Sequence, residues 1–223
     1  MAKRDVLGML LGSMLIAGCA VPPLYSHVIY EDPTAFVRLE ASPDVDPDVS
    51  ETLHSHPADV SVEQLTQIFS GLLVREHRSS LLLLFMDSAE SMPAFTPKEV
   101  KFLSQHVGTA LQEAVPREFV TFYLSRPLNT TTREVTSGAI FIRGKQFHFM
   151  LSNYRTVYSI PPFGLVYDRR QPAYSLVPRN IDVMFRPSNY TLPIPVSFFE
   201  NLVGEAHDGE IILDLSKFST HRL

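Results

Sequence analysis

Cysteine is nearly absent from this chain of 223 residues, in which Cys19 is the single example. An intramolecular disulfide therefore cannot form, and the core alone must stabilise the fold even in an oxidising compartment. Apart from an apolar run close to the N-terminus, the sequence has no hydrophobic run of the roughly 20 residues that a membrane-spanning helix requires. We therefore expect no transmembrane helix.

Positive charge is also scarce, because 19 Lys and Arg residues stand against 24 Asp and Glu residues, for a net charge of −5. The basic residues form no run, so the chain lacks the electrostatic footprint of a nucleic-acid-binding protein. Hydrophobic residues make up 45% and charged residues 19% of the chain, which is typical of a globular protein. We therefore expect no nucleic-acid partner, and the length suffices for one good core or two small ones.

The common catalytic motifs are missing as well. The sequence has no phosphate-binding loop, no dinucleotide-binding fingerprint and no Cys-x-x-Cys pair. It has only ten glycines, and no serine in the Gly-x-Ser-x-Gly setting that exposes a nucleophile on a sharp turn. Ser137 and His148 are the best hydrolase candidates, but Gly138 lies inside a strand pattern, where glycine is typical of a bulge or a close backbone approach. We expect no catalytic residue, no enzyme activity and no cofactor.

Two histidines, His54 and His56, lie two positions apart in an acidic loop close to Asp59. This spacing resembles the beginning of a zinc or copper site, but no third ligand follows at a clear spacing. We interpret them as exposed loop residues and predict no metal site. His148 lies between Phe147 and Phe149, and we expect it on the exposed side of a β-hairpin.

The N-terminus carries the most specific pattern of the chain. Lys3 and Arg4 precede an apolar run over residues 6–17, which is too short to span a membrane, and the run ends in Ile16-Ala17-Gly18-Cys19. This segment resembles the lipobox that lipoprotein signal peptidase reads in bacterial lipoproteins. The resemblance covers residues 1–19 and implies cleavage between Gly18 and Cys19. It also implies acylation of the Cys19 thiol and of the new amine.

The lipobox resemblance also implies an address. Residue 20 is alanine, whereas aspartate at this place retains a lipoprotein in the inner membrane of enteric bacteria. We therefore expect a lipid anchor in the outer membrane and a domain that faces the periplasm, with the cell surface as the open alternative. The patterns over 95–120 and 135–141 also resemble uncharacterised bacterial lipoproteins, a resemblance that brings no functional residues with it.

We predict three segments: a signal peptide over 1–18, a lipidated Cys19 with a proline-containing tether over 19–34, and one α+β domain over 35–223 whose part from about residue 159 is rich in proline. Two helices have clear start signals. Ser61 with Gln64 forms a capping box, and Thr96 is followed by Pro97 and Glu99. A surface loop is expected over 42–60.

Strands are predicted from alternation over 35–41 and 119–124 and from a hairpin that joins 135–142 to 146–151. Further short elements are expected: strands over 81–86, 165–167, 181–185 and 210–215, and a helix over 196–203. The sum is an α+β fold, a mostly antiparallel sheet with two main helices packed on one face.

Aromatic and arginine residues gather in one stretch of the second half. Side chains of these types are enriched where proteins recognise partners, and we predict a partner-binding surface formed by Tyr154, Arg155, Tyr158, Phe163 and Tyr167. Our leading hypothesis is a non-enzymatic outer-membrane lipoprotein that binds or scaffolds another envelope protein. A carrier of lipid or a small ligand, with a cavity between helices and sheet, is the alternative, and an envelope hydrolase is the third.

Overall fold

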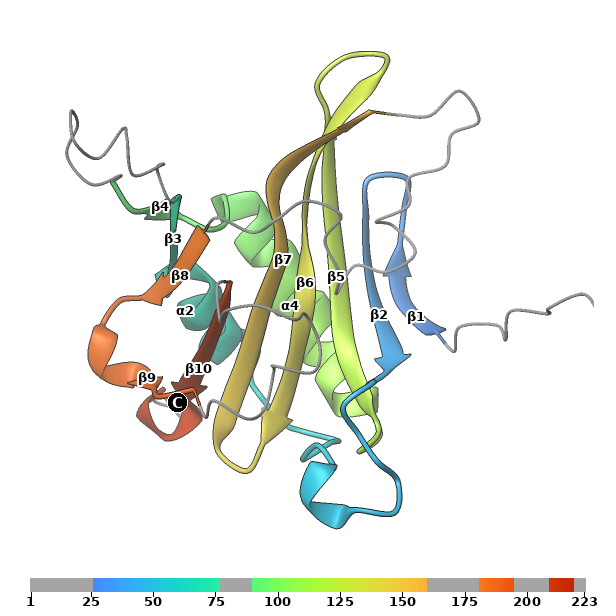
Figure 1. The fold of residues 1–223 in the computed structure, drawn as a ribbon, viewed down its shortest axis with the longest axis vertical. Helices are drawn as coiled ribbons and strands as arrows, with labels where there is room; N and C mark the ends of the chain where they lie inside the picture. Colours follow the sequence, from blue (N-terminus) through green and yellow to red (C-terminus); the bar gives the residue numbers. More distant parts are fainter. Residues whose placement is uncertain (1–25, 77–89, 160–180, 195–208, 219–223) are drawn as a thin grey trace, which may run out of the picture.

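The computed structural model describes residues 26–76, 90–159, 181–194 and 209–218 of the chain. It confirms an α+β fold in which a large antiparallel sheet carries two helices on one face (Figure 1). Seven strands form the main sheet, in the order β1-β2-β5-β6-β7-β10-β9, and three more form a smaller sheet, in the order β4-β3-β8. Each recorded pair of neighbouring strands is antiparallel.

The strands of the main sheet differ greatly in length. They are β1 (Ser26–Glu31), β2 (Ala35–Ala41), β5 (Glu118–Pro127), β6 (Thr132–Arg143), β7 (Gln146–Ser159), β9 (Thr191–Leu192) and β10 (Glu210–Asp214). The smaller sheet contains β3 (Leu72–Glu76), β4 (Met92–Pro93) and β8 (Ile181–Phe185), and three 3₁₀ turns lie at Ser50–Thr52, Ser188–Tyr190 and Leu215–Lys217. The long hairpin of β6 and β7 forms the middle of the main sheet (Figure 1).

Both helices begin as their sequences predict. In α2 (Val62–Gly71), the Gln64 N–H donates to the Ser61 hydroxyl and the Ser61 N–H donates to the Gln64 side chain. In α4 (Pro97–Glu113), Thr96 and Glu99 form the same reciprocal pair around Pro97. A capping box satisfies backbone N–H groups that have no partner inside the helix, so both helix starts are determined locally.

The helix-covered face of the main sheet is an apolar core. It is formed by alternate residues of the central strands together with the inner sides of α2 and α4. Four phenylalanine rings contact one another edge-on or stacked across this layer: Phe69 of α2, Phe95, Phe122 of β5 and Phe149 of β7. Because these rings come from four separate segments, they join helices and sheet into one packing unit.

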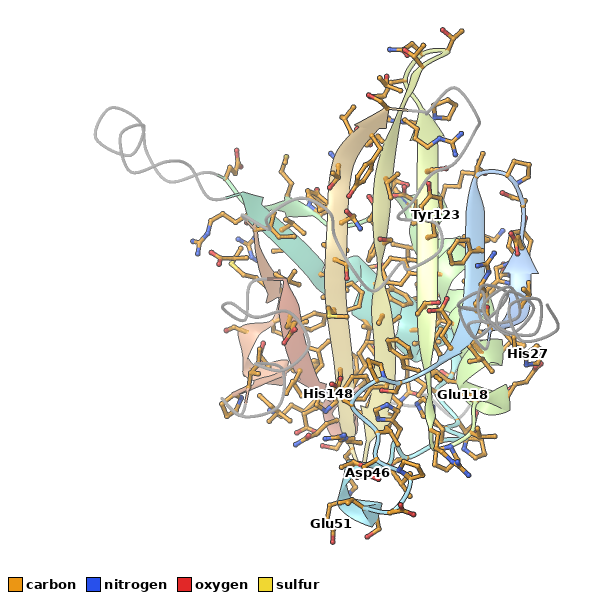
Figure 2. The ribbon with its side chains drawn as sticks, turned by 45° about the vertical axis from the view of Figure 1, so that its right-hand side comes forward. His27, Asp46, Glu51, Glu118, Tyr123 and His148 are labelled. Atoms are coloured by element: carbon orange, nitrogen blue, oxygen red, sulfur yellow. The ribbon has the colours of Figure 1, made fainter. Side chains whose placement is uncertain are left out.

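The opposite face of the main sheet is buried as well. Phe36 stacks on Tyr123 with ring centroids 5.2 Å apart, and Phe141 stacks on His148 at 4.4 Å. Figure 2 shows Tyr123 higher on the sheet and His148 close to its lower end, where the loop with Asp46 and Glu51 protrudes. The alternation predicted for β2 and β7 is present. Both sets of side chains are buried over Phe147–Tyr154 of β7, whereas in β2 Arg38 and Glu40 are half-buried beside the fully buried Phe36.

The expected tether differs from the structure over its second half, because residues 26–31 form strand β1. The Asp32 carboxylate accepts hydrogen bonds from the N–H groups of Thr34 and Ala35 at 2.6 and 2.7 Å. This turn reverses the chain and pairs β1 with β2. The Asp-Pro-Thr signal of the turn was present in the sequence and was read only as part of a proline-rich tether.

The strands at 35–41, 181–185 and 210–214 agree closely with the predictions. Strands β5, β6 and β7 are longer than predicted, and β3, β4 and β9 were not predicted. Bulges between β6 and β7 interrupt the alternation near Ser137 and Asn153. A prediction based on strict alternation therefore ends both strands before the part of the hairpin beyond the bulges. Gly18, Cys19 and the elements predicted over 81–86, 165–167 and 196–203 lie outside the described residues.

Candidate binding groove

A groove of about 810 Å³ runs between the outer sides of α2 and α4. One wall is the row Val62, Thr66 and Ser70 on α2, and the other is the row Pro97, Lys101 and Gln105 on α4. Residues four apart lie above one another on a helix, so each wall is a straight ridge. We call this site the α2–α4 groove.

The two helices that form the groove are antiparallel. The backbone of Gly108, close to the end of α4, lies against Leu65 and Val62, close to the start of α2. At the other end, the Phe69 ring contacts the Phe95 ring at 5.8 Å. The short side chains of the α2 row, Val62, Thr66 and Ser70, face the α4 row across an open channel.

The floor of the groove is apolar and buried, and its rim is exposed. Phe95 and Val100 are 4% and 7% exposed, whereas Val62 and Met92 are 44% and 41% exposed. Val62 lies by the start of α2 and Met92 before the start of α4, so an exposed apolar side chain flanks the apolar floor at each end of the groove. The groove is thus a shallow open channel, not an enclosed cavity.

The charge of the groove is opposite to that of the chain. Lys101 and Arg155 are its charged lining residues among those described, and no described lining residue is Asp or Glu. The whole chain has a net charge of −5. An apolar ligand with negative charge is therefore better suited to this surface than a neutral or cationic one.

Arg155, at the end of the groove, has an unusual backbone. Its φ angle is +47°, the one positive φ of a described residue other than glycine, and this region is unfavourable for side chains with a Cβ. The Arg155 N–H donates to the Thr136 hydroxyl at 3.2 Å, and its guanidinium lies over the Tyr154 ring at 5.2 Å from the centroid. Strained residues of this kind cluster at functional sites.

The structure divides the predicted partner-binding residues. Arg155 lines the groove, whereas Tyr154 is buried and donates its hydroxyl hydrogen to the carbonyl of the lining residue Pro93 at 3.4 Å. Tyr158 lies on the opposite face of the sheet, where it packs against the cluster of Phe36, Tyr123 and Val135. Phe163 and Tyr167 lie outside the described residues.

A second cavity of about 580 Å³ adjoins the groove and shares Thr96 and Arg155 with it. Its lining carries both signs of charge, with Asp32, Glu99 and Glu134 beside Lys98 and Arg126. The Arg126 guanidinium donates to both oxygens of Glu134 at 3.0 and 3.1 Å. This cleft therefore neutralises much of its own charge, unlike the α2–α4 groove.

The prediction that His54, His56 and His148 are exposed was wrong. They are 3%, 5% and 4% exposed, because the loop before α2 folds back against β6. The Ser55 N–H donates to the Ile142 carbonyl at 2.7 Å, and the Ile142 N–H donates to Nε2 of His56 at 3.1 Å. The loop thus uses free backbone groups at the lower end of β6, which a local pattern cannot indicate.

Burial lowers the pKa of all three histidines. The pKa of His54 is lowered to about 3 by burial and then by the neighbouring His56, Arg143 and His148. Burial lowers the pKa of His148 to about 3, with Arg143 as a second cause, and that of His56 to about 4 against the opposing effect of Glu118. All three are therefore neutral at neutral pH. Within the described ranges, no three His, Cys, Asp or Glu residues are grouped so that they could hold a metal ion.

The hydrolase candidates Ser137 and His148 do not meet. In the β6–β7 ladder Ser137 pairs with Asn153, while His148 pairs with Phe141, four residues further along β6. Four strand residues span about 13 Å. Ser137 is fully buried and accepts a hydrogen bond from the Asn153 amide at 2.8 Å. The interpretation of Gly138 is confirmed, because an added Cβ would come within 2.0 Å of the Met150 carbonyl oxygen.

The groove was not predicted, although a signal for it was present. Val62 and Pro97 each begin a row of residues four apart, and the other members of both rows are polar. Pro97 is explained by its place in the first turn of α4, so the exposed Val62 is the local signal of a second contact surface. Which two rows face each other depends on helix packing.

The chain was compared with protein-family models, with curated proteins and with solved structures, and none of the three comparisons found a match. Function has therefore to be inferred from the geometry of the site. In the part of the chain that the structure describes, no helix combines the length and apolar character needed to cross a membrane.

Proposed function

We propose that this protein is a non-enzymatic, lipid-anchored protein of the bacterial envelope that binds a partner protein through the α2–α4 groove. The lipobox-like segment ending in Cys19 supports the anchor, and three acyl chains would hold the domain on a membrane far more firmly than one. Ala20 after the cysteine favours the outer membrane, with the domain towards the periplasm.

The observation that carries the binding role is the exposure of the groove's apolar side chains. Val62 and Met92 are more than two-fifths exposed beside a buried apolar floor. A small ligand typically has most of its surface buried in its pocket, which an open channel does not offer. A protein segment, by contrast, covers such a channel and keeps its own polar side in water, which favours a protein partner over a carrier role.

Membrane anchoring lowers the affinity that a binding site of this kind needs. A domain that is confined to a membrane surface meets other envelope proteins at a high effective concentration. Even a modest affinity at the groove is then sufficient for assembly, so a short apolar channel with two cations is an adequate recognition surface.

Site-specific photo-crosslinking in the native cells tests the binding role. A photoreactive residue at Thr66 or Met92, on the groove walls, is expected to give one crosslinked protein of constant mass. The control position is Val157 of β7, which is 57% exposed and does not line the groove. Equal crosslinking from Val157, or none from either groove position, would contradict the proposal.

Intact mass and membrane fractionation test the anchor separately. The native protein is expected in the outer-membrane fraction, with the mass of a chain that begins at Cys19 and carries three acyl groups. The Cys19→Ala variant should lose this mass increment and leave the membrane. An unlipidated native chain, or a variant with unchanged fractionation, would remove the anchor from the proposal.

A further inference from the structure

We infer that the α2–α4 groove accepts an amphipathic helix that is acidic along the edges of its apolar stripe. This inference rests on the proposed function and names the chemistry of the partner. It derives from the two parallel side-chain rows, the buried apolar floor and the one-sided charge of the lining residues.

The shape of the groove matches a helix. Its α4 wall extends from Pro97 to Gln105, which corresponds to about 12 Å or two helical turns. A third helix laid over two antiparallel helices packs its own ridge of i, i+3/i+4 and i+7 residues into the channel between them. Phe95 and Val100 provide the buried floor that such a ridge would contact, and Val62 and Met92 become covered.

An added β-strand is a poorer match to the same site. The strand beside the groove, β4, has only the two residues Met92 and Pro93. Pro93 has no N–H to donate, and its carbonyl already accepts the hydrogen bond from Tyr154. Strand addition therefore has almost no free backbone groups to use there, whereas helix docking requires only side-chain contacts.

The positive charges of the groove favour a partner helix with acidic side chains. Lys101 lies on the α4 wall and Arg155 at the end of the groove, and no described lining residue opposes them with a carboxylate. The Arg155 guanidinium lies over the Tyr154 ring, and Arg155 also lines the neighbouring cleft, whose lining includes Glu99 and Glu134. Lys101 is thus the lining cation that belongs to the groove alone. Carboxylates on the partner helix would pair with both cations at the rim.

The chain offers a sharp optical test, because it contains no tryptophan and its one cysteine is Cys19. A bimane fluorophore is attached to Thr66→Cys in the full lipidated protein in uncharged nanodiscs. Two model helices of about 18 residues share one apolar stripe with a single tryptophan, and differ only in carrying Glu or Lys beside it. Tryptophan quenches bimane only on contact, so quenching reports occupation of the groove itself.

We expect the Glu helix to quench the fluorophore at Thr66→Cys and to leave one at Val157→Cys unchanged. Double reversal by Lys101→Glu and Arg155→Glu should weaken binding of the Glu helix about tenfold, because two rim attractions become repulsions. It should also strengthen binding of the Lys helix. The matched control is Lys98→Glu with Arg126→Glu, which alters two cations of the neighbouring cleft and none of the groove.

Equal binding of both helices, or a Glu-helix affinity that the double reversal leaves unchanged, would overturn the inference. If photo-crosslinking from Thr66 persists in that case, the proposed function stands and only the chemistry of the partner is wrong. Oleate tests the remaining alternative, an anionic lipid as the ligand of the groove. A bimane response to oleate that depends on Lys101 and Arg155, without any response to either helix, would assign the groove to an anionic lipid instead.

Discussion

The two faces of the seven-stranded sheet are both buried, yet they differ in chemistry. On the helix-covered face the buried side chains are apolar, and phenylalanine rings from four segments contact one another. On the opposite face the buried set includes imidazoles and hydroxyl groups beside the aromatic rings, and the Glu40 carboxyl group there is half-buried. One sheet thus combines a face whose burial is favourable at any pH with a face whose burial depends on protonation.

The largest difference between the faces should appear in acid. Below pH 6.5 the unfolded chain protonates His54, His56 and His148, whereas the folded chain does not until about pH 4 or 3. Burial raises the pKa of Glu40 from 4.5 to about 7, so between these values the folded chain binds one proton more than the unfolded chain. Among these four groups, three histidines against one glutamate leave two extra protons on the unfolded state. The lowered pKa of His106 acts in the same direction, and the raised pKa of Asp44 opposes it. Stability should therefore fall by about 3 kcal/mol per pH unit, or about 5 kcal/mol between pH 6.5 and 4.5.

Urea unfolding followed by circular dichroism across this pH range measures the slope. His54→Phe should reduce it by one proton, about 1.4 kcal/mol per pH unit. Phe141→Leu is the control, because it removes a ring of the same stack without removing a titrating group. Phe141→Leu should lower the free energy of unfolding at every pH and leave its slope against pH unchanged. A slope that His54→Phe does not change would contradict the assignment of the pH dependence to the buried histidines.

The apolar face should be the more sensitive to loss of volume. Phe149 contacts Phe69, Phe95 and Phe122 and is 2% exposed. Phe149→Ala should lower the free energy of unfolding by about 3–5 kcal/mol, through lost burial and the cavity left behind. This loss should be the same at pH 7 and pH 5.5, because no titrating group is removed, whereas the contribution of the buried histidines on the opposite face changes with pH. A loss below about 1 kcal/mol would indicate that the ring cluster is not the centre of the core.

The bulge on β6 allows the two long strands to approach closely, and Gly138 is its critical residue. A Cβ at this position would meet the Met150 carbonyl oxygen at 2.0 Å and the Phe122 ring at 3.0 Å. Gly138→Ala should cost about 1–3 kcal/mol, because backbone as well as side chains must move. Gly144→Ala is the comparison: its surroundings are open, and only its φ of +56° opposes the change. Thermal unfolding of both variants should rank Gly138→Ala as the less stable.

The smallest expected change in stability concerns one hydrogen bond on the face of the sheet opposite the helices. The Tyr158 hydroxyl donates to the Asn153 side-chain oxygen at 2.6 Å, and the Asn153 amide donates to Ser137. Tyr158→Phe should cost about 1 kcal/mol, the usual net value of a partly buried hydrogen bond. Thr109→Ala, at an exposed site on α4, serves as a control for small polar deletions. A larger loss from Tyr158→Phe would mean that this network organises the bulge.

The local elements were predictable where local chemistry determines them. The capping boxes at Ser61 and Thr96 form as expected, since they need only residues three apart. The alternation over 35–41 and the hairpin turn at Gly144 also follow from nearest neighbours. Of the residues that line the candidate site, Arg155 was identified by residue type. Thr66, Met92 and Lys101 were not, because separate segments contribute them.

The sequence by itself determined the fold class, the helix starts, the strand period and the lipobox-like segment, because each depends on residues close together along the chain. Only the tertiary structure decided that both faces of the sheet are buried, since burial of His54, His56 and His148 depends on a loop folding back against β6. It also decided the groove, which exists because α2 and α4 lie antiparallel and leave two side-chain rows uncovered. Distances between segments far apart in the chain are set by packing, and no local pattern encodes them.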